Sequence, residues 1–189
     1  MNSLLRLLRQ HFPAAILWVQ VPPAIAVVLF FGVEHPYYRM FPVLLLTGGL
    51  AFLLPGFVSG RARFLPPLYY YGLISLLSAT STRTSRPVAG FVFHPAEYFF
   101  LAVLLAWALS RSTKRSSMRA VGIMLALCAL AGGLDEWHQS FVPGRVADPV
   151  DWILDLSGAL AGSLFFLALP RALRAPAAPP ATCGERNFP

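Results

Sequence analysis

Charged residues are scarce in this chain: of its 189 residues, 12% are charged and 57% are hydrophobic. A typical soluble domain is about 25% charged and about 45–50% apolar. Every soluble surface needs polar groups, and this chain has too few of them to cover a compact molecule of its length. The composition therefore argues against a soluble enzyme and against a disordered chain. It favours a protein that resides in a lipid membrane.

Cysteine and the common catalytic motifs are also scarce or absent. The two cysteines, Cys128 and Cys183, fall in a long apolar run and in a tail rich in proline and alanine, so we predict no disulfide and no zinc-binding cysteine pattern. The sequence contains no glycine-rich phosphate loop, no Gly-x-Ser-x-Gly motif and no His-Glu-x-x-His motif. The net charge of +7 is interpreted as basic loops beside a membrane, and no nucleic-acid partner is expected.

Long apolar runs predict an all-α integral membrane protein, built as a bundle of six transmembrane helices. A helix needs roughly 20 residues to cross about 30 Å of hydrocarbon. The prolines Pro22 and Pro23 are expected to kink the first run. The six runs are residues 13–33, 41–58, 65–80, 94–110, 118–138 and 149–169.

The charges predict the orientation of this bundle. Six spans place both termini on one side, and most of the fifteen basic residues fall on that side. Because basic loops stay in the cytoplasm, both termini are predicted to be cytoplasmic. All acidic residues except Glu185 fall at or near the opposite, outer ends of the helices. Acidic residues contribute little to orientation, so we infer that the outer side uses carboxylates for another purpose.

The segment 135–155 is the most informative part of the chain. The fifth helix should end near His138, and a Pro-Gly turn follows it. The last helix should begin at Pro149, with Asp148 as its N-cap. This segment therefore predicts a helical hairpin whose turn carries several polar side chains.

One face of the last helix combines carboxylates with glycines. Asp151, Asp155, Gly158 and Gly162 follow one another at spacings of four, three and four residues, which place them on one side of a helix. The glycine pair lets another helix approach closely, as small residues do inside membranes. An ionisable group as deep as Asp155 should face a polar cavity or a partner.

Two other helices each offer a histidine and a carboxylate three residues apart. Asp135 and His138 lie near the end of the fifth helix, and His94 and Glu97 lie where the fourth helix is expected to begin. Imidazole and carboxylate groups suit zinc, iron or manganese, and they equally suit acid–base catalysis. The candidate ligands of a divalent metal ion are His94, Glu97, Asp135, His138 and Asp155.

Further residues receive candidate roles around this centre. Arg145 has the planar donor fork that grips a phosphate or carboxylate group. Structural interpretations stay open beside these roles, namely helix capping for Asp148, Asp151 and Glu97 and charge neutralisation for Arg145. The catalytic candidates are Asp135, His138, Glu97 and Glu136. The substrate-binding candidates are Arg145, Gln139, Asp148 and Asp151.

These motifs together resemble the signature of the VanZ-like membrane proteins. The matching blocks are Asp135-Glu136-x-His138-Gln139, Pro143-Gly144-Arg145, Asp148, Asp151, Leu77-Ser78 and His94-x-x-Glu97-Tyr98. The sequence departs from the family pattern at Val92-Phe93, where the family often has Asp-Lys, and at Asp155, where it often has Asn.

The resemblance covers about residues 65–170 and implies a domain organisation. We expect a two-span extension at 1–60, a VanZ-like four-span domain at 65–170 and a disordered cytoplasmic tail at 171–189. It also implies a bacterial cytoplasmic membrane protein whose polar site faces the periplasmic or extracellular side. The family takes its name from a membrane protein of glycopeptide-resistance clusters, which is associated with reduced teicoplanin susceptibility.

Three functional hypotheses follow. In the first, the protein binds or modifies a lipid-linked or amphiphilic envelope molecule, as a metal-dependent or acid–base hydrolase or transferase in contact with membrane lipids. The second is a small-molecule or lipid transporter, including a proton-coupled carrier, because intramembrane carboxylates mark such pathways. The third is a non-catalytic membrane scaffold. The substrate, the reaction and the oligomeric state stay open at this stage.

Overall fold

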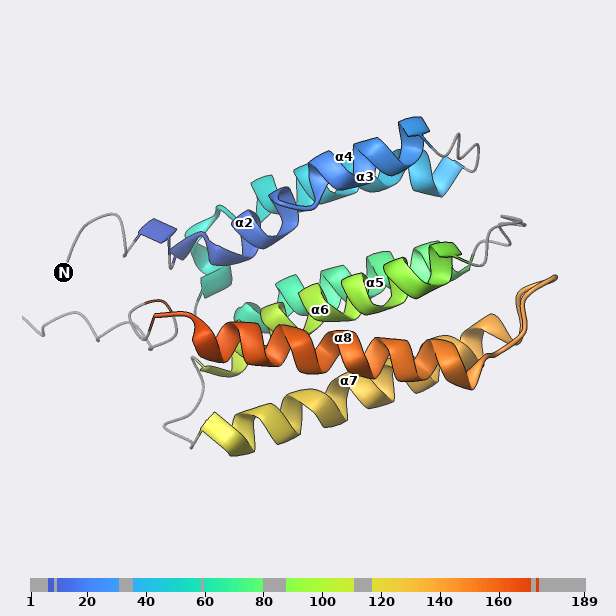
Figure 1. Ribbon diagram of the computed structural model, residues 1–189. Helices are drawn as coiled ribbons and strands as arrows, with labels where there is room; N and C mark the ends of the chain where they lie inside the picture. The colour runs from blue at the N-terminus through green and yellow to red at the C-terminus, as the bar shows by residue number, and fades with distance from the viewer. Residues whose placement is uncertain are drawn as a thin grey trace, which may run out of the picture.

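The computed structural model describes residues 7–8, 10–30, 36–58, 60–79, 88–110, 117–170 and 173. Within these residues the regular structure is entirely helical, which confirms the predicted all-α class (Figure 1). Two short 3-10 helices, Pro55–Val58 and Gly60–Phe64, join α4 to α5. The α-helices are α2 (Phe12–Trp18), α3 (Val21–Phe30), α4 (Pro36–Ala51), α5 (Leu65–Ser78), α6 (Val88–Ser110), α7 (Ser117–Gln139) and α8 (Pro149–Ala168).

Four segments of the described chain are long and apolar enough to cross a membrane. They match the first, fourth, fifth and sixth predicted spans. The second and third predicted spans fall on α4, with 16 residues, and α5, with 14 residues, which are shorter than the roughly 20 residues of a full span. Apart from Leu173, the predicted tail 171–189 lies outside the described residues. The four segments are Phe12–Leu29, Val92–Ser110, Arg119–Gln139 and Pro149–Ala168.

Prolines set several helix boundaries. The first span is interrupted between Trp18 and Val21, directly before Pro22 and Pro23. Proline has no backbone N–H to donate to the preceding turn, and this explains why the helix is interrupted where a kink was predicted. In α5, by contrast, two prolines occupy the first turn, where a missing N–H costs nothing.

The prediction that the fourth helix begins at His94 is wrong. The helix α6 begins at Val88 and continues through Pro95, which lies inside it. Neighbouring helices in a membrane bundle can satisfy a carbonyl that a proline leaves free, so the helix need not stop there. Glu97 therefore lies within the helix and not in its first turn. The capping interpretation of Glu97 is wrong for the same reason.

The helices form two groups around α5 and α6. In Figure 1, α2, α3 and α4 lie together on one side of this central pair, and α7 and α8 lie on the other. Buried side chains such as Leu17, Leu45, Ile74 and Leu104 form an apolar core that joins the first group to the central pair. The N-terminal helices therefore pack against the remainder of the bundle.

Two glycines bring α8 into backbone contact with α6. A Cβ atom added at Gly158 would lie 2.0 Å from the carbonyl oxygen of Pro95, and one at Gly162 would lie 2.3 Å from that of Phe99. No larger residue fits without moving the helices apart, which confirms the predicted close approach. This contact holds Asp155, one turn before Gly158, against the part of α6 that carries His94.

Candidate functional site

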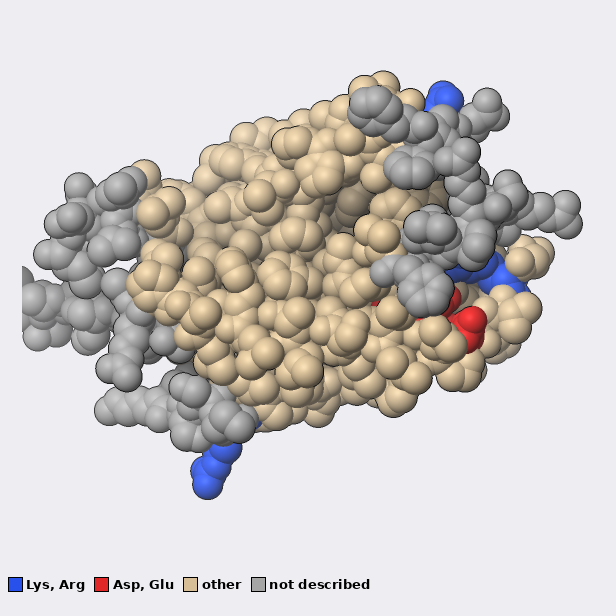
Figure 2. Space-filling view, viewed as in Figure 1, with Lys and Arg blue, Asp and Glu red and all other residues tan. Residues whose placement is uncertain are grey.

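A group of polar side chains is buried at one end of the bundle, where α5 and α7 end and α8 begins. Asp155, Asp135 and Glu136 have exposed fractions of 0%, 1% and 7%, and His94 is also buried. In Figure 2 the visible acidic side chains gather at this end, beside basic ones, on a surface that is otherwise largely uncharged. We call His94, Glu97, Asp135, Glu136, Asp151 and Asp155 the acidic cluster.

His94 lies between two carboxylates of α8. Its Nδ1 atom is 3.0 Å from Oδ1 of Asp155, and its Nε2 atom is 3.4 Å from Oδ2 of Asp151. These two aspartates are four residues apart, so they extend from the same face of α8. The predicted face of the last helix is therefore the face that contacts α6, and both of its carboxylates meet one imidazole.

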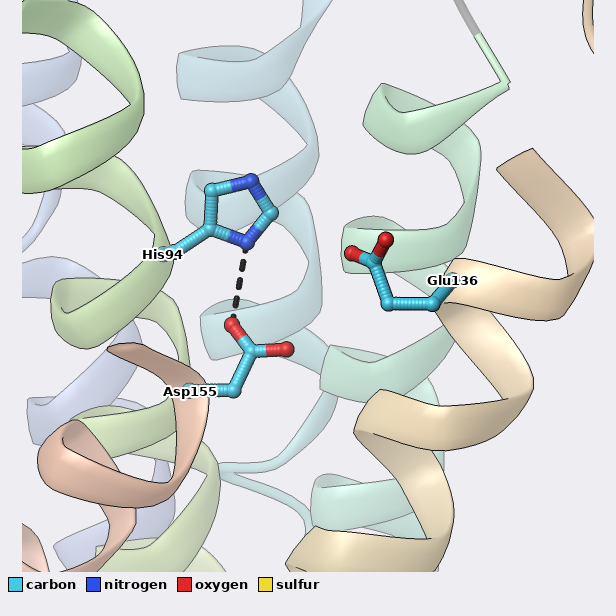
Figure 3. A group of neighbouring side chains, drawn as sticks. All are labelled: His94, Glu136 and Asp155. Atoms are coloured by element: carbon cyan, nitrogen blue, oxygen red, sulfur yellow. Dashed lines mark hydrogen bonds and ion pairs between the residues drawn. The ribbon is translucent and has the colours of Figure 1, made fainter. Parts of the chain in front are cut away.

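Glu136 approaches the same point from α7 (Figure 3). His94, Glu136 and Asp155 each offer one possible ligand atom, and these atoms all lie within 4.8 Å of one another. Oε2 of Glu136 accepts a hydrogen bond of 2.7 Å from the backbone N–H of Asp148. Among the described residues, Oε1 of Glu136 and Oδ2 of Asp155 are buried without a hydrogen-bond partner. One imidazole and two carboxylates form a ligand set that suits zinc, iron or manganese.

Asp135 is the centre of a separate hydrogen-bond chain. Its Oδ2 atom accepts from the Ser78 hydroxyl at 2.8 Å and from the Gln139 amide at 2.7 Å. The oxygen of that amide in turn accepts a hydrogen bond from the Arg145 guanidinium. Arg145 thus reaches the acidic cluster through Gln139. The other carboxylate oxygen of Asp135, Oδ1, is buried and has no hydrogen-bond partner within the described part of the chain.

The remaining candidates lie at the edge of this group. Asp148 is exposed, and its carboxylate accepts from the N–H of Val150 at 2.8 Å, as expected of an N-cap. Glu97 is half-buried and close enough to Asp135 and Asp155 to interact with both electrostatically. His138 is exposed, and no hydrogen bond or ion pair to another described residue joins it to the acidic cluster.

Sequence reasoning missed two polar side chains near the site. Ser78 donates to Asp135, and the hydroxyl of Tyr98 is buried without a partner among the residues that the structure describes. Both residues belong to the motifs that carry the family resemblance, so that resemblance was the available signal. Glu136 was predicted as a catalytic residue, whereas the structure also makes it one of the three possible metal ligands.

The acidic cluster has more carboxylates than cations to balance them. Among the residues that the structure describes, His94 within the cluster and Arg145 beside it are the groups that can balance this charge. A buried carboxylate is costly unless it pairs with a cation, binds a metal or takes up a proton. The arrangement can therefore hold a divalent cation or exchange protons.

The comparisons with known proteins agree with the motifs. The sequence matches the family VanZ/LLP1 over residues 24–170, a range that begins in α3 and ends just beyond α8. No curated protein and no solved structure matched the chain. The family match covers well over half of the sequence and confirms the predicted resemblance, so the chain belongs to the VanZ/LLP1 family.

Proposed function

We propose that this protein binds and chemically modifies a lipid-linked or amphiphilic envelope molecule, with a divalent metal ion held by His94, Glu136 and Asp155. The observation that carries this proposal is the convergence of three ligand atoms within 4.8 Å. Two of these residues also have a buried carboxylate oxygen that no described residue satisfies. A bound cation would satisfy both oxygens and balance the excess negative charge.

The proposal includes six membrane spans, cytoplasmic termini and an acidic cluster near the outer face. Arg61 and Arg63 lie in the 3-10 helix that precedes α5, and Arg119 lies at the start of α7. Ser78, Asp135 and Glu136 lie at the opposite ends of those helices. Because basic segments stay in the cytoplasm, this distribution supports an outward-facing cluster.

Each group of the site has a distinct chemical role in this proposal. His94, Glu136 and Asp155 would hold the divalent cation, which when bound would supply Lewis-acid polarisation of a phosphoryl or carbonyl oxygen of the head group. Arg145 offers two parallel N–H donors to an anionic group, in addition to its bond to Gln139. Glu97 and Asp135 are the carboxylates that would take a proton from the reacting group or give one to it. Hydrolysis or transfer at the head group is the reaction class that fits these roles.

The link to teicoplanin in this proposal rests on the family resemblance. Teicoplanin carries an acyl chain, so it belongs to the amphiphilic molecules that a membrane site of this kind would meet. A role in glycopeptide resistance is therefore one physiological setting of the proposed activity. Deleting the gene and measuring teicoplanin susceptibility tests that setting, and unchanged susceptibility would exclude it.

Metal content tests the metal centre directly. We expect purified protein, reloaded with zinc, manganese or iron, to hold close to one equivalent of metal by mass spectrometry. Glu136→Gln and Asp155→Asn should each lose most of it, because each removes a charged ligand. Asp148→Asn is the matched control, since it removes an exposed carboxylate of the same helix and retains an N-cap. Folded variants that retain the metal, or a wild type that never binds it, would refute the centre.

One observation supports the scaffold hypothesis as a second candidate. The chain of hydrogen bonds from Ser78 through Asp135 and Gln139 to Arg145 fastens α5 to the hairpin between α7 and α8. A scaffold predicts that Asp135→Asn lowers stability and that no variant of the acidic cluster affects a reaction. An enzyme predicts that the same variant stays folded and loses activity on an amphiphilic substrate. The carrier hypothesis instead requires substrate flux across liposomes that contain the protein.

A further inference from the structure

A cavity of about 210 Å³ lies between the α3–α4 pair and the α5–α6 pair. Its walls are formed mainly by apolar side chains, among them Ala24, Val27 and Val28 of α3, Phe41 of α4 and Phe100 of α6. The face in Figure 2 is hollowed between these two pairs, near the end that carries the acidic side chains. For comparison, an apolar protein cavity of about 150 Å³ is large enough to bind benzene.

The cavity meets the acidic cluster at Glu97. This residue lines the cavity and lies three residues after His94 in α6, on the same side of the helix as the imidazole that contacts Asp155. Leu77, another lining residue, directly precedes Ser78, whose hydroxyl donates to Asp135. An apolar chamber and a polar site therefore lie side by side and share one carboxylate.

We propose that this cavity binds the hydrocarbon chain of an amphiphile whose anionic head group occupies the acidic cluster. This inference rests on the proposed function and names its substrate class as a phosphorylated or carboxylated lipid with an extended chain. Gln20, Tyr38, Tyr70 and Glu97 also line the cavity, but most of its wall is hydrocarbon, which favours an apolar occupant. Part of the cavity wall comes from α3 and α6, which belong to segments long enough to span a bilayer, where such chains are abundant.

The two halves of this site have different tasks. Moving a chain from the bilayer into an apolar cavity gains little, because lipid tails are as apolar as the cavity wall. Selectivity must therefore come from the head group, where Arg145 and a cation held by the acidic cluster would supply positive charge. The cavity fixes the direction of the chain and so places the head group at the cluster.

The test uses hexadecyl phosphate that carries a diazirine in the middle of its chain. The full-length protein is placed in phosphatidylcholine nanodiscs, irradiated with the probe and digested for mass spectrometry. We expect crosslinks on the cavity walls at Val27, Phe41 and Phe100, and we expect unlabelled hexadecyl phosphate to abolish them. Crosslinks confined to lipid-facing residues such as Leu130, or insensitive to the competitor, would overturn the proposal.

Filling the cavity provides a matched pair of variants. Ala24→Phe adds a ring inside the cavity, and Ala126→Phe adds the same ring on the exposed face of α7. We expect Ala24→Phe to lower the crosslinking yield by about tenfold, because the added ring overpacks the cavity. We expect Ala126→Phe to leave the yield unchanged. Equal crosslinking in both folded variants would overturn the proposal. If Ala24→Phe does not fold, the competition experiment on the wild type decides whether the cavity binds the chain.

Two controls separate this inference from the proposed function. A diazirine analogue of hexadecanol should label the cavity weakly, because it lacks the anionic head group. Labelling as strong as that by the phosphate would overturn the proposal that the head group binds at the acidic cluster. Metal content is measured on the same samples. A protein that binds metal but is labelled only on its lipid-facing side refutes the cavity site alone. A protein without metal whose cavity is labelled refutes the metal centre alone.

Discussion

Replacing Gly158 by alanine should damage both the fold and the site, because this glycine sets the distance between α6 and α8. The added Cβ atom would lie 2.0 Å from the carbonyl oxygen of Pro95, whereas side-chain atoms of this kind essentially never approach closer than 3.0 Å. The obstacle is backbone and cannot rotate away. The two helices must therefore separate by at least 1.0 Å, the difference between these distances.

This separation has a cost that can be estimated. Overpacking of this kind costs about 1–3 kcal/mol, and for a chain of this size about 1 kcal/mol lowers Tm by about 2–4 °C. We therefore expect Gly158→Ala to lower the Tm in detergent by about 2–12 °C. The same movement would lengthen the 3.0 Å contact between His94 and Asp155, so the metal content should also fall.

The control for this prediction is Gly122→Ala. Gly122 lies in α7, and no neighbouring atom lies within 4 Å of the position of an added Cβ atom. Alanine is favoured over glycine inside a helix by about 0.5–1 kcal/mol, so this variant should be slightly more stable than the wild type. Thermal unfolding followed by intrinsic fluorescence measures both. If Gly158→Ala unfolds at the wild-type temperature and retains its metal, the described contact between α6 and α8 is refuted.

Three further predictions concern the surroundings of the site. Ser78→Ala removes one of the two donors to Oδ2 of Asp135 and should lower the free energy of unfolding by about 1–3 kcal/mol. The loss should be measured as a lower Tm, and an unchanged Tm would contradict this role of Ser78. Asp148→Ala should lower the free energy of unfolding by about 1 kcal/mol, because the N-cap is lost, whereas Asp148→Asn should keep the wild-type Tm. An asparagine variant as unstable as the alanine variant would show that the charge is responsible instead. Arg145→Lys keeps the charge but loses the planar fork, and it should weaken competition by hexadecyl phosphate by about tenfold, whereas equal competition would exclude bidentate binding.

Local signals predicted the last helix well. Asp148 and Pro149 are a cap and a first-turn residue whatever else surrounds them, so the start of α8 follows from a few neighbouring residues. The spacing of Asp155, Gly158 and Gly162 likewise defines a shared face before any partner is known. The structure adds that this face packs against α6.

Contacts between distant segments were not predictable in the same way. Three-residue spacing groups Asp135 with His138, but it does not say which side of α7 faces α8. Packing against α5 and α8 buries Asp135 and Glu136 and leaves His138 exposed. Pro95 also carries an ambiguous local signal, because proline is common both at helix starts and inside membrane helices. The cavity between the α3–α4 and α5–α6 pairs depends entirely on such long-range packing.

The carboxylates of α8 affect how this helix is inserted into the membrane during synthesis. Asp155 lies about 10 Å inside the helix, and an aspartate at the centre of an inserting helix costs about 2.5–3.5 kcal/mol. The imidazole that receives it belongs to α6, which is synthesised earlier in the chain. We therefore expect α8 to enter the bilayer efficiently only when α6 is already in place. The order of the helices along the chain is then also the order in which the membrane can accept them.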